Sequence, residues 1–407
     1  MIRTTTAALA CLALLVGCDD DPSPDPGPAD AAAADGQVGM GGAGGAGGVG
    51  GMGGAGGVGG MGGAGGVGGM GGAGGTGGVG GTGGAGGMGG APAAGSTAGV
   101  ACAVQGEGTQ QLVYSLVNPR QGTRQAVDES LPFRYAWSCD EAERTLRANG
   151  VPNHPVTGGE FATAISEQAL EIGFSLTPAL TGEAAVIREP GYALNGVKFD
   201  PMTAGTCPDD AGDDDDCDYA MGRDQWHMVA TPGGTSPWRF SFGVDENDAH
   251  VQPNGQYHYH GDPVRLVEQL NPDFDTRMTL VGWAADGFPM YSVYGHADPA
   301  DAGSAVVKMA SSYRRIEAVP ADRPAVEDFP LGHFEEDWEY VEGLGDLDEC
   351  NGRFGVTPEF PDGIYHYHIT ETYPTVMRCV KGTAPASSMG PPGGGMRPPG
   401  GGPGGRP

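Results

Sequence analysis

The sequence predicts a mainly β protein: a single antiparallel, sandwich-like domain with long loops and few short helices, flanked by disordered Gly/Pro-rich segments. Short apolar or alternating runs recur between residues 100 and 383, and Gly, Pro, Asn and Asp separate them. Helical periodicity is weak in the same segment. Most of the 78 Gly lie outside it, so this segment is the part of the chain that can bury a sizeable core.

The strand candidates follow one another along this folded segment. They are the runs 111–117, 161–176, 238–242, 278–283 and 288–291. The run 161–176 also has helical spacing, so its type stays open. Residues 140–148 and 263–270 could each form a short helix.

The N-terminus is typical of an exported bacterial lipoprotein. Residues 1–17 combine Arg3 with an apolar run of about ten residues, which is too short to span a bilayer and suits a signal peptide. The sequence Leu15-Val16-Gly17-Cys18 resembles the lipobox, in which the cysteine is lipidated and becomes the first mature residue. A plain secretory signal with an incidental cysteine is the alternative. We expect Cys18 to anchor the protein to a membrane of the bacterial cell envelope, with the domain periplasmic or at the cell surface.

Residues 18–99 are expected to form the lipid anchor and a disordered tether. An acidic, Pro-rich stretch is followed by a Gly-Gly-X repeat without Pro, which excludes collagen and favours a flexible coil. Residues 384–407 form a second disordered Gly/Pro-rich tail. The formal net charge of −30 argues against nucleic acid as a partner, because phosphate binding needs a basic surface. Cations are the natural partners of such a surface.

Six cysteines remain once Cys11 and Cys18 are assigned to the signal peptide and the lipid. An even set in an exported chain favours disulfides. Fifteen pairings are possible, and an alternative leaves one pair reduced. Proximity in the sequence suggests the pairs Cys102 with Cys139, Cys207 with Cys217, and Cys350 with Cys379.

The main evidence for a functional site is the tetrapeptide Tyr-His-Tyr-His, which occurs at residues 257–260 and again at 365–368. Each copy of this motif is called a word below. Successive side chains on a strand point to opposite faces, so both histidines of each word share one face and the tyrosines can pack on the other. Neighbouring strands could bring the four imidazoles together, and His250 could join them across the turn at 253–255. Imidazole suits copper or zinc, so the metal-ligand candidates are His250, His258, His260, His366 and His368. The alternative is that these histidines bind no metal and stabilise a polar core through hydrogen bonds to backbone and carboxylates.

The same words give the chain its resemblance to the bacterial YHYH domain family, over residues 185–383. The matching stretches are GYALNGVKFDP at 191–201, DENDAHVQPNGQYHYH at 245–260, GWAADGFPMY at 282–291, LDECNGRFG at 347–355 and YHYHITETYP at 365–374. The resemblance implies an exported, disulfide-containing domain and supplies no mechanism. Some relatives carry a Cys where this chain has Asn247 and Asp248, and Met290-Tyr291-Ser292 replaces a more usual Ile-Tyr-Gly.

Three polar residues in these stretches are candidates for supporting roles. Asp286, Asp348 or Asn351 could orient a metal-bound imidazole by a hydrogen bond, or serve as a general base. The alternative is a local turn in which the side chain bonds nearby backbone, which is favoured more for Asn351 than for Asp286.

An acidic loop lies between Cys207 and Cys217. Its carboxylates could bind Ca²⁺. Because the loop lacks the EF-hand spacing, a solvated acidic loop is the favoured interpretation.

Three function classes follow from these observations. The first is a membrane-anchored extracytoplasmic lipoprotein that binds Cu or Zn. The second is a metal-dependent extracytoplasmic enzyme of the hydrolase type, with Asp286 as candidate base. The third is a carbohydrate- or ligand-binding display module, in which tyrosines and tryptophans form the binding face and the histidines are structural. Whether the chain is an enzyme stays open.

Overall fold

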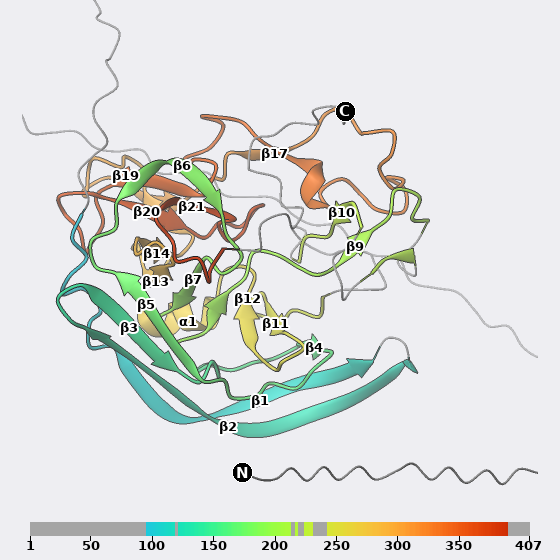
Figure 1. The fold of residues 1–407 in the computed structure, drawn as a ribbon, viewed down its shortest axis with the longest axis horizontal. Helices are drawn as coiled ribbons and strands as arrows, with labels where there is room; N and C mark the ends of the chain where they lie inside the picture. The colour runs from blue at the N-terminus through green and yellow to red at the C-terminus, as the bar shows by residue number, and fades with distance from the viewer. Residues whose placement is uncertain (1–94, 119–120, 213–215, 219–223, 231–241, 390–407) are drawn as a thin grey trace, which may run out of the picture. The chain divides into compact units, whose positions relative to one another are not determined.

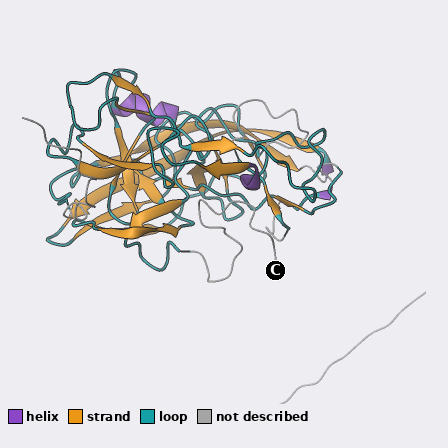
Figure 2. Ribbon diagram, turned by 90° about the horizontal axis from the view of Figure 1, so that it is seen from above, coloured by secondary structure: helices purple, strands orange, loops and turns teal. Residues whose placement is uncertain are grey.

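The computed structural model describes residues 95–118, 121–212, 216–218, 224–230 and 242–389 (Figure 1). All of them belong to one compact unit, Gly83–Pro407. The signal peptide, Cys18, the tether up to residue 94 and the tail from residue 390 lie outside the described residues. So do residues 238–241 of the strand expected at 238–242. Within the described residues the chain is mainly β, with one α-helix, as predicted (Figure 2). None of its helices there is long and apolar enough to cross a membrane.

The first sheet has five strands and is built from residues 105–175. Its order is β4-β1-β2-β3-β5, with β1 Gln105–Asn118, β2 Thr123–Cys139, β3 Glu143–Ala148, β4 Glu160–Phe161 and β5 Leu170–Ser175. The long β1–β2 hairpin curves along one side of the domain (Figure 1). The strand expected at 111–117 is therefore confirmed within β1. The ambiguous run 161–176 contributes the end of β4 and all of β5.

The short helix expected at 140–148 is wrong, because this segment forms β3. The Asp140 carboxylate accepts the backbone N–H groups of Ala142 and Glu143, which makes a tight turn after β2. From Glu143 onward, burial alternates, with Arg144 and Leu146 fully buried. Burial with period two fits a strand that pairs with β2 and β5 rather than a helix.

The second sheet has eight strands and carries both Tyr-His-Tyr-His words. Its order is β11-β12-β8-β7-β13-β14-β20-β19. The strands are β7 Gly191–Ala193, β8 Lys198–Phe199, β11 Ala249–Val251, β12 Tyr257–Tyr259, β13 Leu280–Ala284, β14 Pro289–Tyr291, β19 Gly352–Gly355 and β20 Ile364–His368. The strands expected at 278–283 and 288–291 are confirmed as β13 and β14. The helix expected at 263–270 is α1, Val264–Leu270.

This sheet has two halves with the same connectivity. The hairpins β7–β8 and β13–β14 lie at its centre, where β7 and β13 pair antiparallel. The strand β12 runs parallel to β8, and β20 runs parallel to β14. The outer strands β11 and β19 then pair antiparallel with β12 and β20. The two words therefore occupy equivalent places, one in each half.

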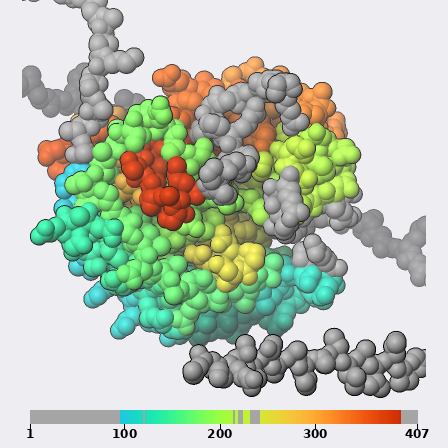
Figure 3. Space-filling model, in the orientation of Figure 1, coloured from blue at the N-terminus to red at the C-terminus, as the bar shows by residue number. Residues whose placement is uncertain are grey.

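Four two-stranded sheets accompany the two large sheets among the described residues. They pair β6 Leu180–Val186 with β21 Cys379–Gly382, β9 Thr206–Cys207 with β10 Trp226–His227, β15 Tyr294–His296 with β16 Val306–Lys308, and β17 Tyr313–Arg315 with β18 Trp338–Tyr340. A 3-10 helix, η3 Glu335–Asp337, precedes β18. Figure 3 shows the C-terminal part of the domain, in red, bordering green surface on this face, in keeping with the β6–β21 pairing.

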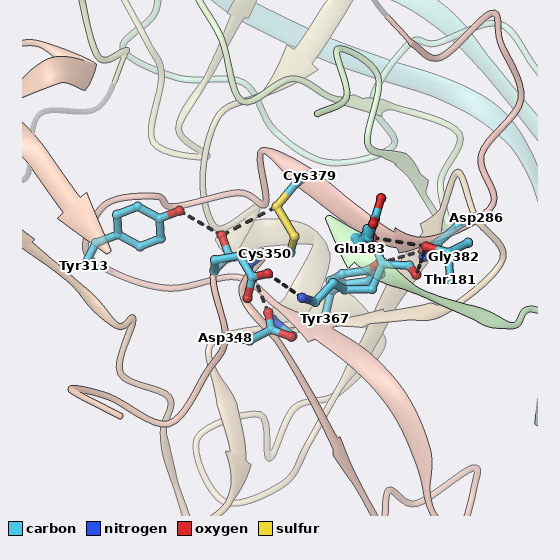
Figure 4. The surroundings of a disulfide bond; sticks show 12 residues. Thr181, Glu183, Asp286, Tyr313, Asp348, Cys350, Tyr367, Cys379 and Gly382 are labelled. Carbon is cyan, nitrogen blue, oxygen red and sulfur yellow. Dashed lines mark hydrogen bonds and ion pairs between the residues drawn. A yellow bond between two sulfur atoms is a disulfide. The ribbon is translucent and has the colours of Figure 1, made fainter. Parts of the chain in front are cut away.

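One buried hydrophobic cluster contains side chains from both large sheets. Leu112 of β1 and Phe161 of β4 belong to the same buried cluster as the four tyrosines of the two words. All three disulfides suggested by sequence proximity form: Cys102–Cys139, Cys207–Cys217 and Cys350–Cys379. The third ties the loop before β19 to β21, next to the second histidine pair's strand (Figure 4).

Candidate metal centre

Three histidines converge in the first half of the eight-stranded sheet. His250 of β11 lies directly across from His258 of β12, and His260 follows on the same face. The His260 Nε2 atom is 3.0 Å from His258 Nε2 and 2.9 Å from His250 Nε2. The approach of His250 across the turn is thus confirmed. Among the described residues, these three form the group whose side chains could hold a metal ion.

Hydrogen bonds fix the tautomers of two of these rings. The Nδ1 atoms of His258 and His250 lie 3.1 Å and 2.7 Å from the carbonyl oxygens of Gln256 and Phe242. A carbonyl oxygen only accepts, so each Nδ1 carries the hydrogen and each Nε2 turns its lone pair toward the cluster. The Nδ1 atom of His260 has no hydrogen-bond partner among the described residues.

This arrangement of three nitrogen atoms suits a metal ion better than a shared proton. A proton on His260 Nε2 can be shared well with one neighbouring lone pair, whereas a metal ion can accept all three. Tetrahedral zinc with bonds of roughly 2.0–2.1 Å holds its nitrogen ligands about 3.3 Å apart. The two distances from His260 Nε2, 3.0 Å and 2.9 Å, therefore need to lengthen by only a few tenths of an ångström.

Burial keeps the three imidazoles neutral. Burial is the largest cause that lowers the pKa of His250, and it holds the pKa values of His258 and His260 well below the usual range. The Asp200 carboxylate acts in the opposite direction on His250 and His260, and it accepts a hydrogen bond from the buried Lys198 ammonium at 2.9 Å. Neutral imidazole is the form that binds metal.

The tyrosines of both words lie on the opposite side of their strands. Tyr257, Tyr259 and Tyr367 are fully buried and Tyr365 nearly so. The Tyr257 hydroxyl donates to Asp245, and the Tyr259 hydroxyl lies 2.6 Å from His154 Nε2. A sugar-binding face made by these tyrosines is therefore wrong, because their rings and hydroxyls are used inside the core.

The second histidine pair does not join the first. Strands β8, β7, β13 and β14 separate β12 from β20, so the expected single cluster of five histidines is wrong. The physical reason is that each word pairs with the central hairpin of its own half. His366 and His368 are themselves buried, and their ring centroids are 5.1 Å apart.

The three polar candidates contact the tyrosine side and the local backbone. The Asp286 carboxylate accepts the Tyr367 hydroxyl at 2.7 Å and the Gly382 N–H at 2.9 Å (Figure 4). The Asp348 carboxylate accepts the Tyr365 hydroxyl at 2.7 Å. Burial raises the pKa of both carboxyls.

The role expected of these residues is corrected accordingly. Asp286 and Asp348 fix the tyrosines and do not hydrogen-bond an imidazole. Asn351 has a positive φ of 58°, and its carbonyl oxygen accepts the His368 N–H at 2.9 Å. It therefore positions the backbone of the second word rather than an imidazole ring.

We call His250, His258 and His260 the triad. The sequence analysis missed several residues that surround it. They are the carboxylates of Asp245 and Asp200, the Lys198 ammonium and the carbonyl of Phe242. A signal for Asp245 was present, since it stands five residues before His250 just as Asp348 stands five before Arg353.

The acidic loop between Cys207 and Cys217 lies partly outside the described residues, which omit 213–215. Asp209 accepts the Trp226 indole N–H at 3.1 Å, and Asp216 accepts the Gly212 N–H at 2.9 Å. These two carboxylates have structural partners, and calcium binding stays a prediction.

Comparison with known proteins agrees with the sheet and its two words. The family model described as "YHYH protein" matches residues 171–382. Neither the curated proteins nor the solved structures give a match. The family match spans half of the chain and includes both histidine words and both central hairpins, so the chain belongs to the YHYH protein family.

Proposed function

We propose that this chain is an exported lipoprotein, anchored to the bacterial cell envelope through Cys18, whose YHYH domain binds a Cu²⁺ or Zn²⁺ ion through His250, His258 and His260. The observation that carries the proposal is the convergence of three imidazole Nε2 atoms at 2.9 and 3.0 Å. Two of their tautomers are set by backbone carbonyls.

The donor set favours copper or zinc over hard cations. Imidazole nitrogen suits zinc and copper, whereas calcium and magnesium prefer oxygen ligands. Three protein ligands leave a fourth position of a tetrahedral ion for water or for another molecule. The lipobox and the tether support a location outside the cytoplasm.

Calorimetric titration of the full chain, purified without a histidine tag, tests the proposal. One equivalent of Zn²⁺ or Cu²⁺ should bind, with submicromolar affinity. The double variant His258→Gln/His260→Gln should lose this binding, because two of the three lone pairs are gone. His154→Gln is the matched control, since it replaces a buried histidine outside the triad. Millimolar binding by the parent, or equal binding by the double variant, would refute the metal site.

A further inference from the structure

The two halves of the eight-stranded sheet are copies of one unit in sequence. Residues 191–196 read GYALNG and residues 282–287 read GWAADG. Residues 245–250 read DENDAH and residues 348–353 read DECNGR, and each stretch precedes its own Tyr-His-Tyr-His word. Each half therefore has a central hairpin, an Asp-Glu turn and a word.

The hydrogen bonds repeat as well. Asp245 accepts the N–H groups two and four residues later and the Tyr257 hydroxyl, and Asp348 does the same with Tyr365. The residue three positions after each aspartate has a positive φ, 50° at Asp248 and 58° at Asn351. Its carbonyl oxygen accepts the N–H of the last histidine of the word in both halves.

One substitution separates the halves chemically. His250 pairs with His258 across the strands, and at the equivalent place Arg353 pairs with His366. The word and outer strand of the second half thus supply two imidazoles and a guanidinium where those of the first supply three imidazoles. A further imidazole, the buried His296 of β15, acts electrostatically on both His366 and His368. A ligand of the second half must tolerate a fixed positive charge.

The two remaining imidazoles present lone pairs. The Nδ1 atoms of His366 and His368 are each 2.9 Å from a carbonyl oxygen, of Ile364 and Ser292 respectively. Each Nδ1 therefore donates, and each Nε2 is the unprotonated acceptor. Neither Nε2 has a hydrogen-bond partner among the described residues, and both rings are buried.

A thioether lies on the His368 side of this pair. Met309 follows β16, is buried, and has its Sδ atom next to Gly295 of β15. A Cβ placed on Gly295 would lie 2.8 Å from both Met309 Sδ and His368 Cε1, and 3.0 Å from Arg353 Nη2. Glycine at this position lets the sulfur, the imidazole and the guanidinium meet around one point.

We propose that the second half of the sheet holds a separate site for a soft monovalent cation, Cu⁺, with His366 Nε2, His368 Nε2 and Met309 Sδ as its ligands. Thioether and imidazole together suit Cu⁺. The guanidinium of Arg353 repels a divalent ion about twice as strongly as a monovalent one, because Coulomb energy scales with charge. This site shares no ligand with the triad and does not rest on it.

Competition titration of the full chain tests the site. The protein, without a histidine tag, is first saturated with Zn²⁺ and then titrated, without oxygen, with Cu⁺ held by bicinchoninate. One equivalent of Cu⁺ should bind while the Zn²⁺ is retained, and X-ray absorption should show nitrogen and one sulfur around copper. Met309→Leu keeps the size and apolarity of the side chain and should weaken Cu⁺ binding by about tenfold or more.

The histidine variants separate this site from the triad. His366→Gln/His368→Gln should lose the Cu⁺ equivalent and keep Zn²⁺ binding. His258→Gln/His260→Gln should lose Zn²⁺ and keep one Cu⁺. Cu⁺ binding that survives in the first variant, or a Met309→Leu variant equal to the parent, overturns the proposal. Failure of Zn²⁺ binding alone refutes only the triad.

Discussion

His154, in the loop between β3 and β4, contacts Tyr259 of the first word and is predicted to make the stability of the domain depend on pH. It is fully buried, its Nδ1 lies 2.9 Å from the Pro155 carbonyl oxygen, and its Nε2 lies 2.6 Å from the Tyr259 hydroxyl. Burial, the largest cause, lowers its pKa from 6.5 to about 4. In the unfolded chain the imidazole titrates at its ordinary value, about 6.5.

The sign of the resulting pH dependence follows from proton binding. As pH falls from 6.5 toward 4, the unfolded chain takes up a proton at His154 while the folded protein does not. Unfolding is therefore favoured progressively over this window. Between pH 7 and about pH 4.5 the loss of stability from this residue is about 2 kcal/mol, at about 1.4 kcal/mol for each pKa unit.

His154→Gln removes the titration and keeps an amide that can bond the Tyr259 hydroxyl. The unfolding free energy of the parent minus that of the variant should fall by about 2 kcal/mol between pH 7 and about pH 4.5. Urea unfolding of both proteins at the two pH values, with chelator present, gives the comparison. A gap that stays constant within about 0.5 kcal/mol would show that His154 is not held neutral by burial.

Three further predictions concern the anchor, a disulfide and the triad. Cys18→Ser should move the protein from the membrane fraction to the wash, and unchanged partitioning would contradict lipid anchoring. Replacing Cys350 and Cys379 together by Ser should lower the unfolding free energy by about 3–4 kcal/mol, read by urea unfolding, and an unchanged midpoint would contradict this. Because burial holds the pKa values of His258 and His260 well below the usual imidazole range, proton competition for Zn²⁺ should begin only well below the ordinary imidazole pKa of about 6.5, and calorimetry showing release already near pH 7 would contradict buried ligands.

The features that the sequence predicted correctly depend on local spacing. The alternation of histidine and tyrosine in residues 257–260 places the two residue types on opposite faces of any strand, whatever that strand's neighbours are. An even set of cysteines close in sequence led to the three observed disulfides. The approach of His250 to His258 needed only a short turn between adjacent strands.

Other features depended on contacts between distant segments. The chain from Asp140 to Ala148 has no strong local preference, and pairing with β2 and β5 made it a strand. Whether Asp286 contacts an imidazole or a tyrosine depended on which face of β20 meets the turn after β13.

The sequence by itself determined a mainly β chain with two Tyr-His-Tyr-His words, and what each word presents on either face of its strand. Only the tertiary structure decided that the words lie apart, in two equivalent halves of one sheet. The physical reason is that side-chain direction follows from the period of the strand, whereas strand order is set by hydrogen bonds between segments that lie far apart in the sequence.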